Sequence, residues 1–505
     1  MSLLRVAGLL LAFLLSPFAL AKPLQVVSPL EVSSLEPDQN GYLFTRLQVA
    51  ETLVTVDRHG KLIPLLASSW TISKDGLSWH FNVRKNVLMH DGSQLNAGVV
   101  QRALERAHKG SGVLSQAPIS HIETKASEVV IQLSRPFSPL AAYLANYSTQ
   151  ILADSSFDKS GKTISVIGSG PYQIKQVRAP LKVSLVRFER YWKTPAHIKE
   201  VEYLAVGKGE TRALMAQSGQ ADLVFSLLPL SVNSVKRAPN VSLDIVTLPR
   251  TRLLKLNAGS PFFSDVRVRQ ALSLALDRPA LATAILRNPS LAATQLFPPS
   301  VVAWHDSDLP VLTRDLDKAR ALLREAGWQP GADGILQKDG QVFRVTLTTF
   351  STWPELPVLA TAIQAQWREV GVDLAVSVGN SSEIVSKHRD GSLQVGLLSR
   401  NFSLTPDPLG VLSSDFGPKG GDWGAMNWSN NELTSALQAL ESGQAEQSEN
   451  QQLRGVILRH LQQELPVIPI AWSELVVASN KQLSHLYVDP YELSYHLAEL
   501  EWKPL

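Results

Sequence analysis

The residue types that carry catalysis are scattered along this chain rather than gathered into motifs. Its 505 residues include no cysteine, which excludes thiolate nucleophiles and cysteine-ligated metal sites. The His-Glu-x-x-His zinc signature, the phosphate-binding Gly-rich loop and the Gly-x-Ser-x-Gly nucleophile elbow are also missing. The 11 histidines are dispersed, and His108 and His121 are too far apart for a helical metal pair. The sequence therefore predicts a protein that is not an enzyme and has no resident cofactor.

Eleven tryptophans remain as candidates for ligand contact. Most of them are expected to pack in the core. Trp353, Trp423 and Trp428 lie instead in polar, loop-like stretches, where an aromatic ring is available to close over a ligand. Residues 414–424 are polar and rich in glycine, so they predict a loop.

The first 21 residues predict a secretory signal peptide. Arg5 precedes an apolar stretch from Val6 to Leu15, and small residues end the segment, with cleavage expected after Ala21. A membrane anchor is the weaker interpretation, because the apolar stretch is short for a span of about 20 residues. Since no cysteine is available to carry a lipid, we expect a periplasmic protein of a Gram-negative cell.

The overall composition is that of an ordered protein with a large core. Hydrophobic residues make up 44% of the chain and charged residues 18%, without a low-complexity tract. The formal net charge is +3, and the basic residues are spread along the chain. Nucleic acid is therefore not an expected partner.

Helix-like and strand-like stretches alternate, which predicts an α/β protein. Apolar residues recur at helical spacing over three stretches, 265–277, 315–328 and 357–371. Gly327 is placed to cap the second of these helices at its C-terminus. Strand-like residues 343–350 and 372–378 flank the third helix, so this part of the chain predicts a βαβ unit.

Several sequence blocks, in order, resemble the bacterial extracellular solute-binding proteins of family five. These proteins are the peptide- and nickel-binding components of ABC importers. The most extended block is 66–100, which contains Ser69-Trp70, Asp75-Gly76, Trp79-His80-Phe81, Arg84 and Asp91-Gly92. The other blocks are 167–174, 189–203, 211–224, 261–278, 326–340 and 461–472.

The resemblance implies a two-lobed periplasmic-binding-protein fold (type II, cluster C-like) with an extra small domain and a hinge cleft. We place the first, discontinuous lobe at 22–50, 168–255 and 472–505, the extra domain at 51–167 and the second lobe at 256–471. The family further implies a monomer that captures a small ligand and passes it to permease subunits of an ABC importer in the inner membrane.

Residues 381–414 bear on the identity of the ligand. Leu404 stands where peptide-binding relatives carry an acid for the peptide ammonium group. The run resembles nickel-binding members more closely: Arg400 matches, and Phe402 falls at the position of a pocket tryptophan. Those members place a histidine in the loop after residue 414 and an arginine near 144–154, but residues 415–429 contain no histidine and 144–154 no arginine.

The candidate ligand-binding residues are Tyr42, Arg400, Phe402, Trp423 and Trp428. Arg400 has the alternative of an ion pair between structural elements, and Phe402 that of a core residue. We expect a nickel (metal-chelate) complex as ligand. A di- or oligopeptide is the alternative, and a sensor or interaction protein without transport is the second alternative.

Overall fold

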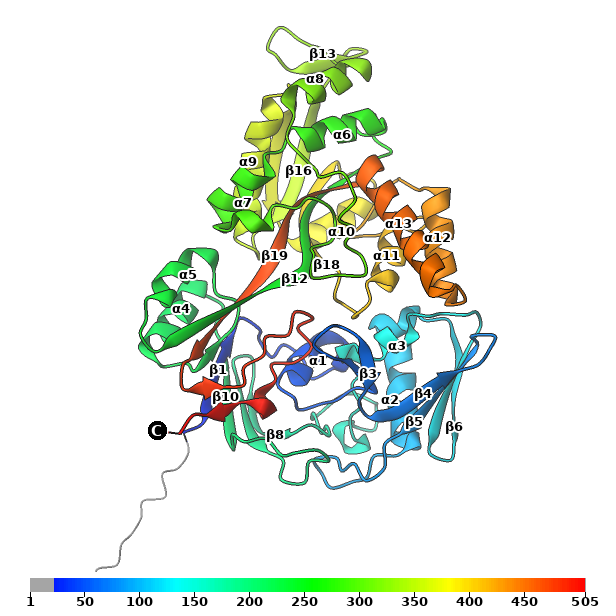
Figure 1. The fold of residues 1–505 in the computed structure, drawn as a ribbon, viewed down its shortest axis with the longest axis vertical. Helices are drawn as coiled ribbons and strands as arrows, with labels where there is room; N and C mark the ends of the chain where they lie inside the picture. Colours follow the sequence, from blue (N-terminus) through cyan, green and yellow to red (C-terminus); the bar gives the residue numbers. More distant parts are fainter. Residues whose placement is uncertain (1–21, 505) are drawn as a thin grey trace, which may run out of the picture.

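A computed structural model describes residues 22–504 of the chain. The predicted signal peptide and its cleavage after Ala21 fall outside the described residues. A ten-stranded sheet runs through most of the molecule, in the order β17-β16-β18-β12-β19-β11-β1-β10-β9-β8 (Figure 1). Its strands are β1 (Leu24–Ser28), β8 (Tyr172–Arg178), β9 (Lys182–Arg187), β10 (Glu200–Ala205), β11 (Leu223–Val224), β12 (Val241–Leu256), β16 (Arg344–Phe350), β17 (Asp373–Gly379), β18 (Val395–Asn401) and β19 (Val467–Asn480).

The long strands β12 and β19 run side by side between the two large parts of the molecule (Figure 1), and they contribute to two separate hydrophobic cores. One core is formed by residues from 24–50, 152–248 and 475–500. Another is formed by residues from 253–472. Strand β12 passes from the first core to the second between Leu248 and Leu253, and β19 returns between Trp472 and Leu475.

A third core, from residues 53–153, lies beside the first. It packs under the antiparallel sheet β4-β5-β7-β6. On β5, Trp79, Phe81 and Val83 alternate inward, as a strand with one buried face requires. This part contains β2 (Val54–Val56), β3 (Leu62–Pro64), β4 (Ala67–Ile72), β5 (Ser78–Val83), β6 (Ile119–Lys125), β7 (Glu128–Leu133), α2 (Ala97–Lys109) and α3 (Leu140–Tyr143).

We propose that the three cores belong to the first lobe, the second lobe and the extra domain, and we use these names below. The domain boundaries given above remain predictions. The helices of the first lobe are α1 (Pro37–Arg46), α4 (Gly209–Ser218) and α5 (Pro229–Lys236). Those of the second lobe are α6 (Val266–Leu274), α7 (Arg278–Leu286), α8 (Leu316–Glu325), α9 (Glu355–Arg368), α10 (Ser381–Arg389), α11 (Leu409–Phe416), α12 (Asn431–Ser442) and α13 (Gln447–Glu464).

Short elements complete the fold. They are strands β13 (Gln329–Pro330), β14 (Leu336–Lys338), β15 (Gln341–Val342), β20 (Leu483–Ser484) and β21 (Glu501–Trp502), and 3-10 turns at Val113–Gln116, Tyr147–Thr149, Asp154–Ser156, Pro289–Leu291 and Leu497–Glu499. In the described part of the chain, no helix combines the length and the apolar character that a membrane crossing needs.

The extra domain also touches the second lobe. The Ser138 hydroxyl donates to the carbonyl of Leu440 at 2.9 Å, and the amide of Asn146 donates to the carbonyl of Leu404. Both contacts come from the segment around α3, which lies near α11 and α12 in Figure 1. The two lobes are therefore joined by the long strands and by contacts of the extra domain.

The α/β class is confirmed, as are the three predicted helices, which are α6, α8 and α9. Strands β16 and β17 pair in parallel across α9, which confirms the βαβ unit. Gly327 follows α8 with φ +91°, the left-handed conformation of a glycine cap. The loop prediction for 414–424 was wrong at its start, because α11 continues to Phe416. Its apolar face of Leu409, Leu412 and Phe416 is buried and keeps those residues helical.

Candidate functional site

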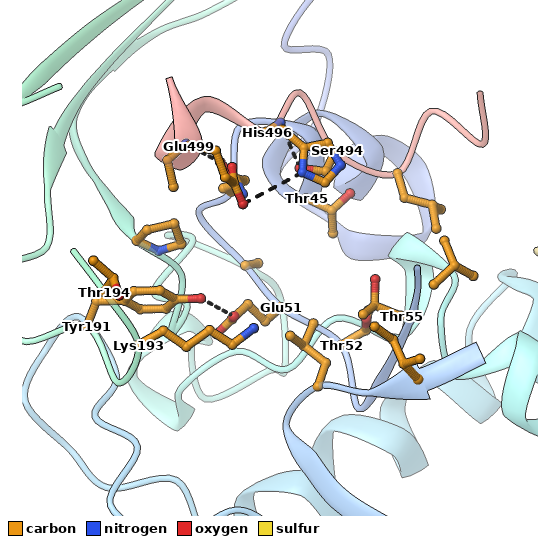
Figure 2. A pocket seen from close by; sticks show the side chains of 18 of the residues that line it. Thr45, Glu51, Thr52, Thr55, Tyr191, Lys193, Thr194, Ser494, His496 and Glu499 are labelled. Atoms are coloured by element: carbon orange, nitrogen blue, oxygen red, sulfur yellow. Dashed lines mark hydrogen bonds and ion pairs between the residues drawn. The ribbon is translucent and has the colours of Figure 1, made fainter. Parts of the chain in front are cut away.

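A hollow of about 710 Å³ lies between the first lobe and the extra domain (Figure 2). Its floor holds the buried Glu51, which accepts hydrogen bonds from Ser169, Tyr191 and Trp192 at 2.7, 2.8 and 3.0 Å. Burial raises the pKa of Glu51, and these three bonds act against that shift. Because its acceptors are engaged by the protein, we regard Glu51 as a connection between the two parts of the chain.

The hinge between the lobes carries a different polar group, built around an irregularity in β12. Strand β12 pairs with β19 at Leu248–Ser473 and again at Thr251–Trp472. Pro249 and Arg250 therefore form a bulge without partners on β19. A proline is tolerated there because a bulge does not require its missing N–H group, and bulges bend a strand and redirect its side chains.

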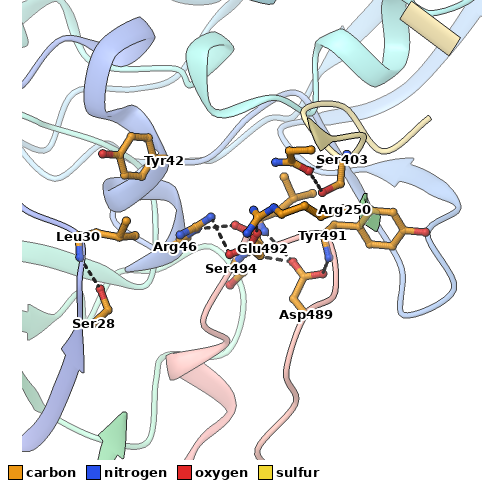
Figure 3. A network of polar contacts seen from close by, with 12 residues as sticks. Ser28, Leu30, Tyr42, Arg46, Arg250, Ser403, Asp489, Tyr491, Glu492 and Ser494 are labelled. Atoms are coloured by element: carbon orange, nitrogen blue, oxygen red, sulfur yellow. Dashed lines mark hydrogen bonds and ion pairs between the residues drawn. The ribbon is translucent and has the colours of Figure 1, made fainter. Parts of the chain in front are cut away.

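Arg250 is directed by this bulge to a carboxylate of the first lobe (Figure 3). Its Nη2 donates to Oε2 of Glu492 at 2.6 Å. Arg46, from the last turn of α1, approaches the same residue: Nε donates to the Glu492 carbonyl at 2.6 Å, and Nη2 lies 3.3 Å from Oε1. The three side chains are 13–15% exposed, so they are largely buried but still reached by solvent.

An aromatic ring accompanies each guanidinium. The Arg46 guanidinium lies 5.7 Å from the ring centre of Tyr42, and that of Arg250 lies 5.4 Å from the ring centre of Trp353. Such cation–π contacts hold a planar guanidinium in place. Trp353 is 41% exposed and lies two residues before α9 of the second lobe, so Arg250 contacts both lobes. We call Tyr42, Arg46, Arg250, Trp353 and Glu492 the hinge cluster.

The charges of the hinge cluster are strongly coupled. Burial acts to raise the pKa of Glu492, but Arg250 and Arg46 outweigh it and hold this pKa below its usual range. Glu492 is therefore ionised at neutral pH and neutralises one of the two guanidiniums. Within the hinge cluster, two guanidiniums therefore share one carboxylate.

The backbone that presents Glu492 is itself constrained. Glu492 has φ +55°, a left-handed conformation that is uncommon for a residue other than glycine. The carboxylate of Asp489 accepts backbone N–H groups from Tyr491, Leu493 and Ser494 at 2.8, 2.8 and 3.2 Å. These bonds tie the turn together and offset the cost of the unusual backbone conformation.

Of the five predicted ligand residues, the structure places Tyr42 in the hinge cluster. Arg400 pairs with Thr251 across the strands next to Arg250, but its guanidinium is bound by Asp415 through two bonds of 2.6 and 2.9 Å. Phe402 is 1% exposed and packs against Phe297, with ring centres 4.8 Å apart. In this structure, both side chains contact other residues of the second lobe. Contact of Arg400 or Phe402 with a ligand therefore remains a prediction.

The other two predicted residues lie elsewhere in the second lobe. Trp428 is buried, and its indole N–H donates to Glu464 at 2.9 Å. Trp423 lines a broad hollow of about 880 Å³ beside α10, together with Arg389 and neighbouring serines. The structure does not bring Trp423 and Trp428 into the hinge cluster.

Residues 404 and 407 have local roles at the start of α11. The carbonyl of Leu404 accepts from Asn146, and its side chain packs on the second core. Asp407 accepts the backbone N–H of Leu409 at 2.9 Å and the indole N–H of Trp304 at 3.3 Å. Asp407 therefore sets the turn into α11, as a residue next to proline often does.

Sequence reasoning missed Arg46, Arg250 and Glu492. One signal was available for Arg250, since "TLPRTRLLKL" places proline and two arginines inside a long strand. Such an interruption indicates a bulge. Across residues 22–504, no group of three or more His, Cys, Asp or Glu side chains is placed to hold a metal ion.

Two lobes joined by paired strands, with a charged cluster at the crossing, define a solute-binding protein of the type II periplasmic class. The family model described as bacterial extracellular solute-binding proteins, family 5 Middle, matches residues 61–423. The chain belongs to this family. Family 5 proteins work with ABC transporter permeases and bind small ligands or peptides.

The relatives differ in what they bind. The nickel-binding periplasmic protein of Escherichia coli K12 is 28% identical over 483 residues, covering 92% of this chain and 90% of that protein. The glutathione-binding protein GsiB of the same strain is 26% identical over 503 residues, covering 96% and 95%.

Solved structures show the same fold. The crystal structure of NikA from Brucella suis in complex with Fe(III)-EDTA has a TM-score of 0.87 at 23% identity, covering 95% of this chain and all of that one. The oligopeptide-binding protein AppA from Bacillus subtilis, in complex with a nonapeptide, has a TM-score of 0.78 at 20% identity, covering 96% and 99%. The predicted two-lobed fold is thereby confirmed.

Proposed function

We propose that this protein captures a small carboxylate-bearing ligand, a nickel (metal-chelate) complex, at the hinge cluster and delivers it to an ABC importer. The observation that supports the proposal is the convergence of Arg46 and Arg250 on one carboxylate, so that two guanidiniums share a single anionic partner within the hinge cluster. Organic chelators of nickel carry carboxylates, and guanidinium groups are well suited to bind them. The metal is cargo and arrives with its own organic ligands.

The donors needed for such a ligand are present. Arg250 uses Nη2 for Glu492, and Arg46 uses Nε and Nη2. Within residues 22–504, Nη1 of Arg250 makes no hydrogen bond to the protein, so it is available to a solute, whereas the Arg46 guanidinium also has the Tyr495 side chain beside it. Tyr42 and Trp353 add aromatic surface on either side of these donors.

The arrangement of the lobes supports a role in delivery. A ligand that contacts Arg250 and a residue of either lobe favours the closed form, because it makes more contacts there. We propose that the protein is exported to the periplasm with cleavage after Ala21, acts as a monomer and presents its closed form to permease subunits of the inner membrane.

A di- or oligopeptide is the second candidate, favoured by the resemblance to GsiB and AppA. A bound peptide needs an acid for its ammonium group. Leu404 does not supply one, and Glu492 is already held by two arginines. The third candidate is a sensor or interaction protein on the same scaffold.

Isothermal titration calorimetry distinguishes these candidates. Mature protein is titrated with Ni(II) plus two equivalents of L-histidine, with L-histidine alone, with glutathione and with a set of dipeptides. The proposal is supported if the nickel complex binds saturably and the other ligands do not bind. The proposal is contradicted if dipeptides bind and the nickel complex does not. Pull-down with inner-membrane proteins then tests delivery, because transport requires a permease among the partners.

A further inference from the structure

Glu492 has a place in the hinge cluster that an ordinary surface ion pair does not have. It is the only carboxylate that the described structure shows bonded to both Arg46 and Arg250. Both guanidiniums are largely buried, so without an anion between them their like charges would repel in a medium of reduced dielectric constant. The strained turn at 489–494 holds this anion in place.

The two arginines depend on Glu492 to different degrees. Arg46 is anchored by the backbone carbonyl of residue 492 as well as by the side chain. On the first-lobe side of the described structure, Arg250 is bound only by the Glu492 carboxylate. On the second-lobe side, its guanidinium contacts the ring of Trp353. Loss of the carboxylate therefore frees Arg250 much more than Arg46.

We propose that Glu492 is a positioning residue for ligand recognition: it fixes the Arg250 guanidinium between the lobes, so that the unpaired edge of Arg250 is presented to a carboxylate of the solute. This inference rests on the proposed function. Glu492 itself does not touch the solute. Because Glu492 already holds the Arg250 side chain in one conformation, binding of the solute does not have to include the entropic cost of ordering that side chain.

Strand β12 provides a matched control two residues away. Arg252 pairs with Glu355 of α9 at 2.6 Å, with similarly low exposure, but on the second-lobe side of the hinge. Arg252 also donates to the carbonyl of Trp472 at 2.8 Å. Glu355→Gln thus removes a charged partner of a hinge arginine without touching the hinge cluster.

The experiment compares wild type, Glu492→Gln, Glu492→Asp and Glu355→Gln in two measurements. Hydrogen exchange of ligand-free protein is followed in peptides that cover 247–253 and 489–495. Affinity is measured by calorimetry with Ni(II) plus two equivalents of L-histidine, and with glutathione. Thermal melts establish that each variant is folded, and Glu492→Asp provides a milder change that keeps the charge.

We expect Glu492→Gln to weaken binding by about tenfold or more, corresponding to about 1.4 kcal/mol, and to speed exchange in both peptides. Glu492→Asp should bind more tightly than Glu492→Gln and more weakly than wild type. The affinity of Glu355→Gln should lie within about twofold of the wild-type affinity, a much smaller change than tenfold. If Glu492→Gln binds as tightly as Glu355→Gln, the inference is overturned while the proposed function stands. If wild type binds neither probe, the proposed function fails and the inference with it.

Discussion

Arg400 and Asp415 form a two-bond ion pair inside the second lobe, with Nε 2.6 Å from Oδ2 and Nη2 2.9 Å from Oδ1. It joins β18 to the last turn of α11, and the carboxylate side chain is 2% exposed. Burial raises the pKa of Asp415, and the adjacent Arg400 opposes that shift. A residue that sequence resemblance assigns to a ligand thus has a partner within its own lobe.

Arg400→Met tests the importance of this pair for stability. The substitution leaves Asp415 buried without its partner, and removing one member of a buried pair costs about 3–5 kcal/mol. Urea unfolding of Arg400→Met should show a loss of that size, and the double variant with Asp415→Leu should recover much of it. Arg102→Met is the control, because the Arg102–Asp154 pair is exposed and should matter by less than about 1 kcal/mol. Equal losses in the two single variants would contradict the prediction.

Lys255 should make the stability of the second lobe depend on pH. Its ammonium group is buried and donates to the carbonyls of Gly421 and Asp422 at 2.6 and 2.9 Å. Burial lowers its pKa to about 7. The charged or titratable groups that influence this environment are Asp415, Asp422, Arg400 and His388.

The direction of the pH effect follows from the proton balance. Between pH 7 and the usual lysine pKa, the unfolded chain keeps a proton that the folded protein has released, so stability rises with pH. The gain is at most about 1.4 kcal/mol per pH unit. The check is to measure the free energy of unfolding of wild type and of Lys255→Met at pH 6, 7.5 and 9. As pH rises, the free energy of unfolding of wild type should increase relative to that of Lys255→Met. Parallel pH profiles would rule out a lowered lysine pKa.

Gly168 should not tolerate a side chain. A Cβ atom there would lie 2.1 Å from the carbonyl oxygen of Val49 and 2.8 Å from Cα of Ala50, and backbone atoms cannot move aside easily. Overpacking of this kind costs about 1–3 kcal/mol or more, so Gly168→Ala should lower the melting temperature. Gly207→Ala is the matched control, since no atom lies within 4 Å of its Cβ position. A Gly168→Ala variant as stable as the control would refute the close approach.

Tyr42 should contribute its ring, rather than its hydroxyl group, to binding. Its ring lies beside the Arg46 guanidinium and meets Tyr147 edge-on, with ring centres 5.5 Å apart. Tyr42→Leu should weaken binding of the Ni(II)–L-histidine complex several-fold, in keeping with cation–π energies of about 0.5–2 kcal/mol. Tyr42→Phe keeps the ring and should bind like wild type. Weakening of similar size in both variants would assign the effect to the hydroxyl group.

Local patterns in the sequence were sufficient for much of the fold. The apolar stripes of α6, α8 and α9 and the strands around α9 follow from periodicity, because burial of one face imposes it. The start of 414–424 was misjudged, since glycines later in that stretch outweighed the apolar face ending at Phe416. Long-range packing, and not composition, decides where a helix of this kind ends.

The hinge cluster was beyond the reach of sequence reasoning for a different reason. Arg46 and Glu492 are separated by 446 positions, and Arg250 and Glu492 by 242. Only the folded sheet brings them together. For Arg400, the sequence identified a residue that binds an anion, but it did not identify the partner. The packing of α11 brings the Asp415 carboxylate to this arginine.

The bulge at Pro249 and Arg250 has a mechanical consequence. Two hydrogen-bonded strands resist stretching and sliding, and an interruption of their ladder makes the pair easier to bend at that place. We therefore expect the strand pair to bend most easily at this bulge when the lobes move relative to each other. A bend confined to the bulge lets the lobes close without reordering the rest of the strand pair, so we expect less of the contact energy to be lost to ordering.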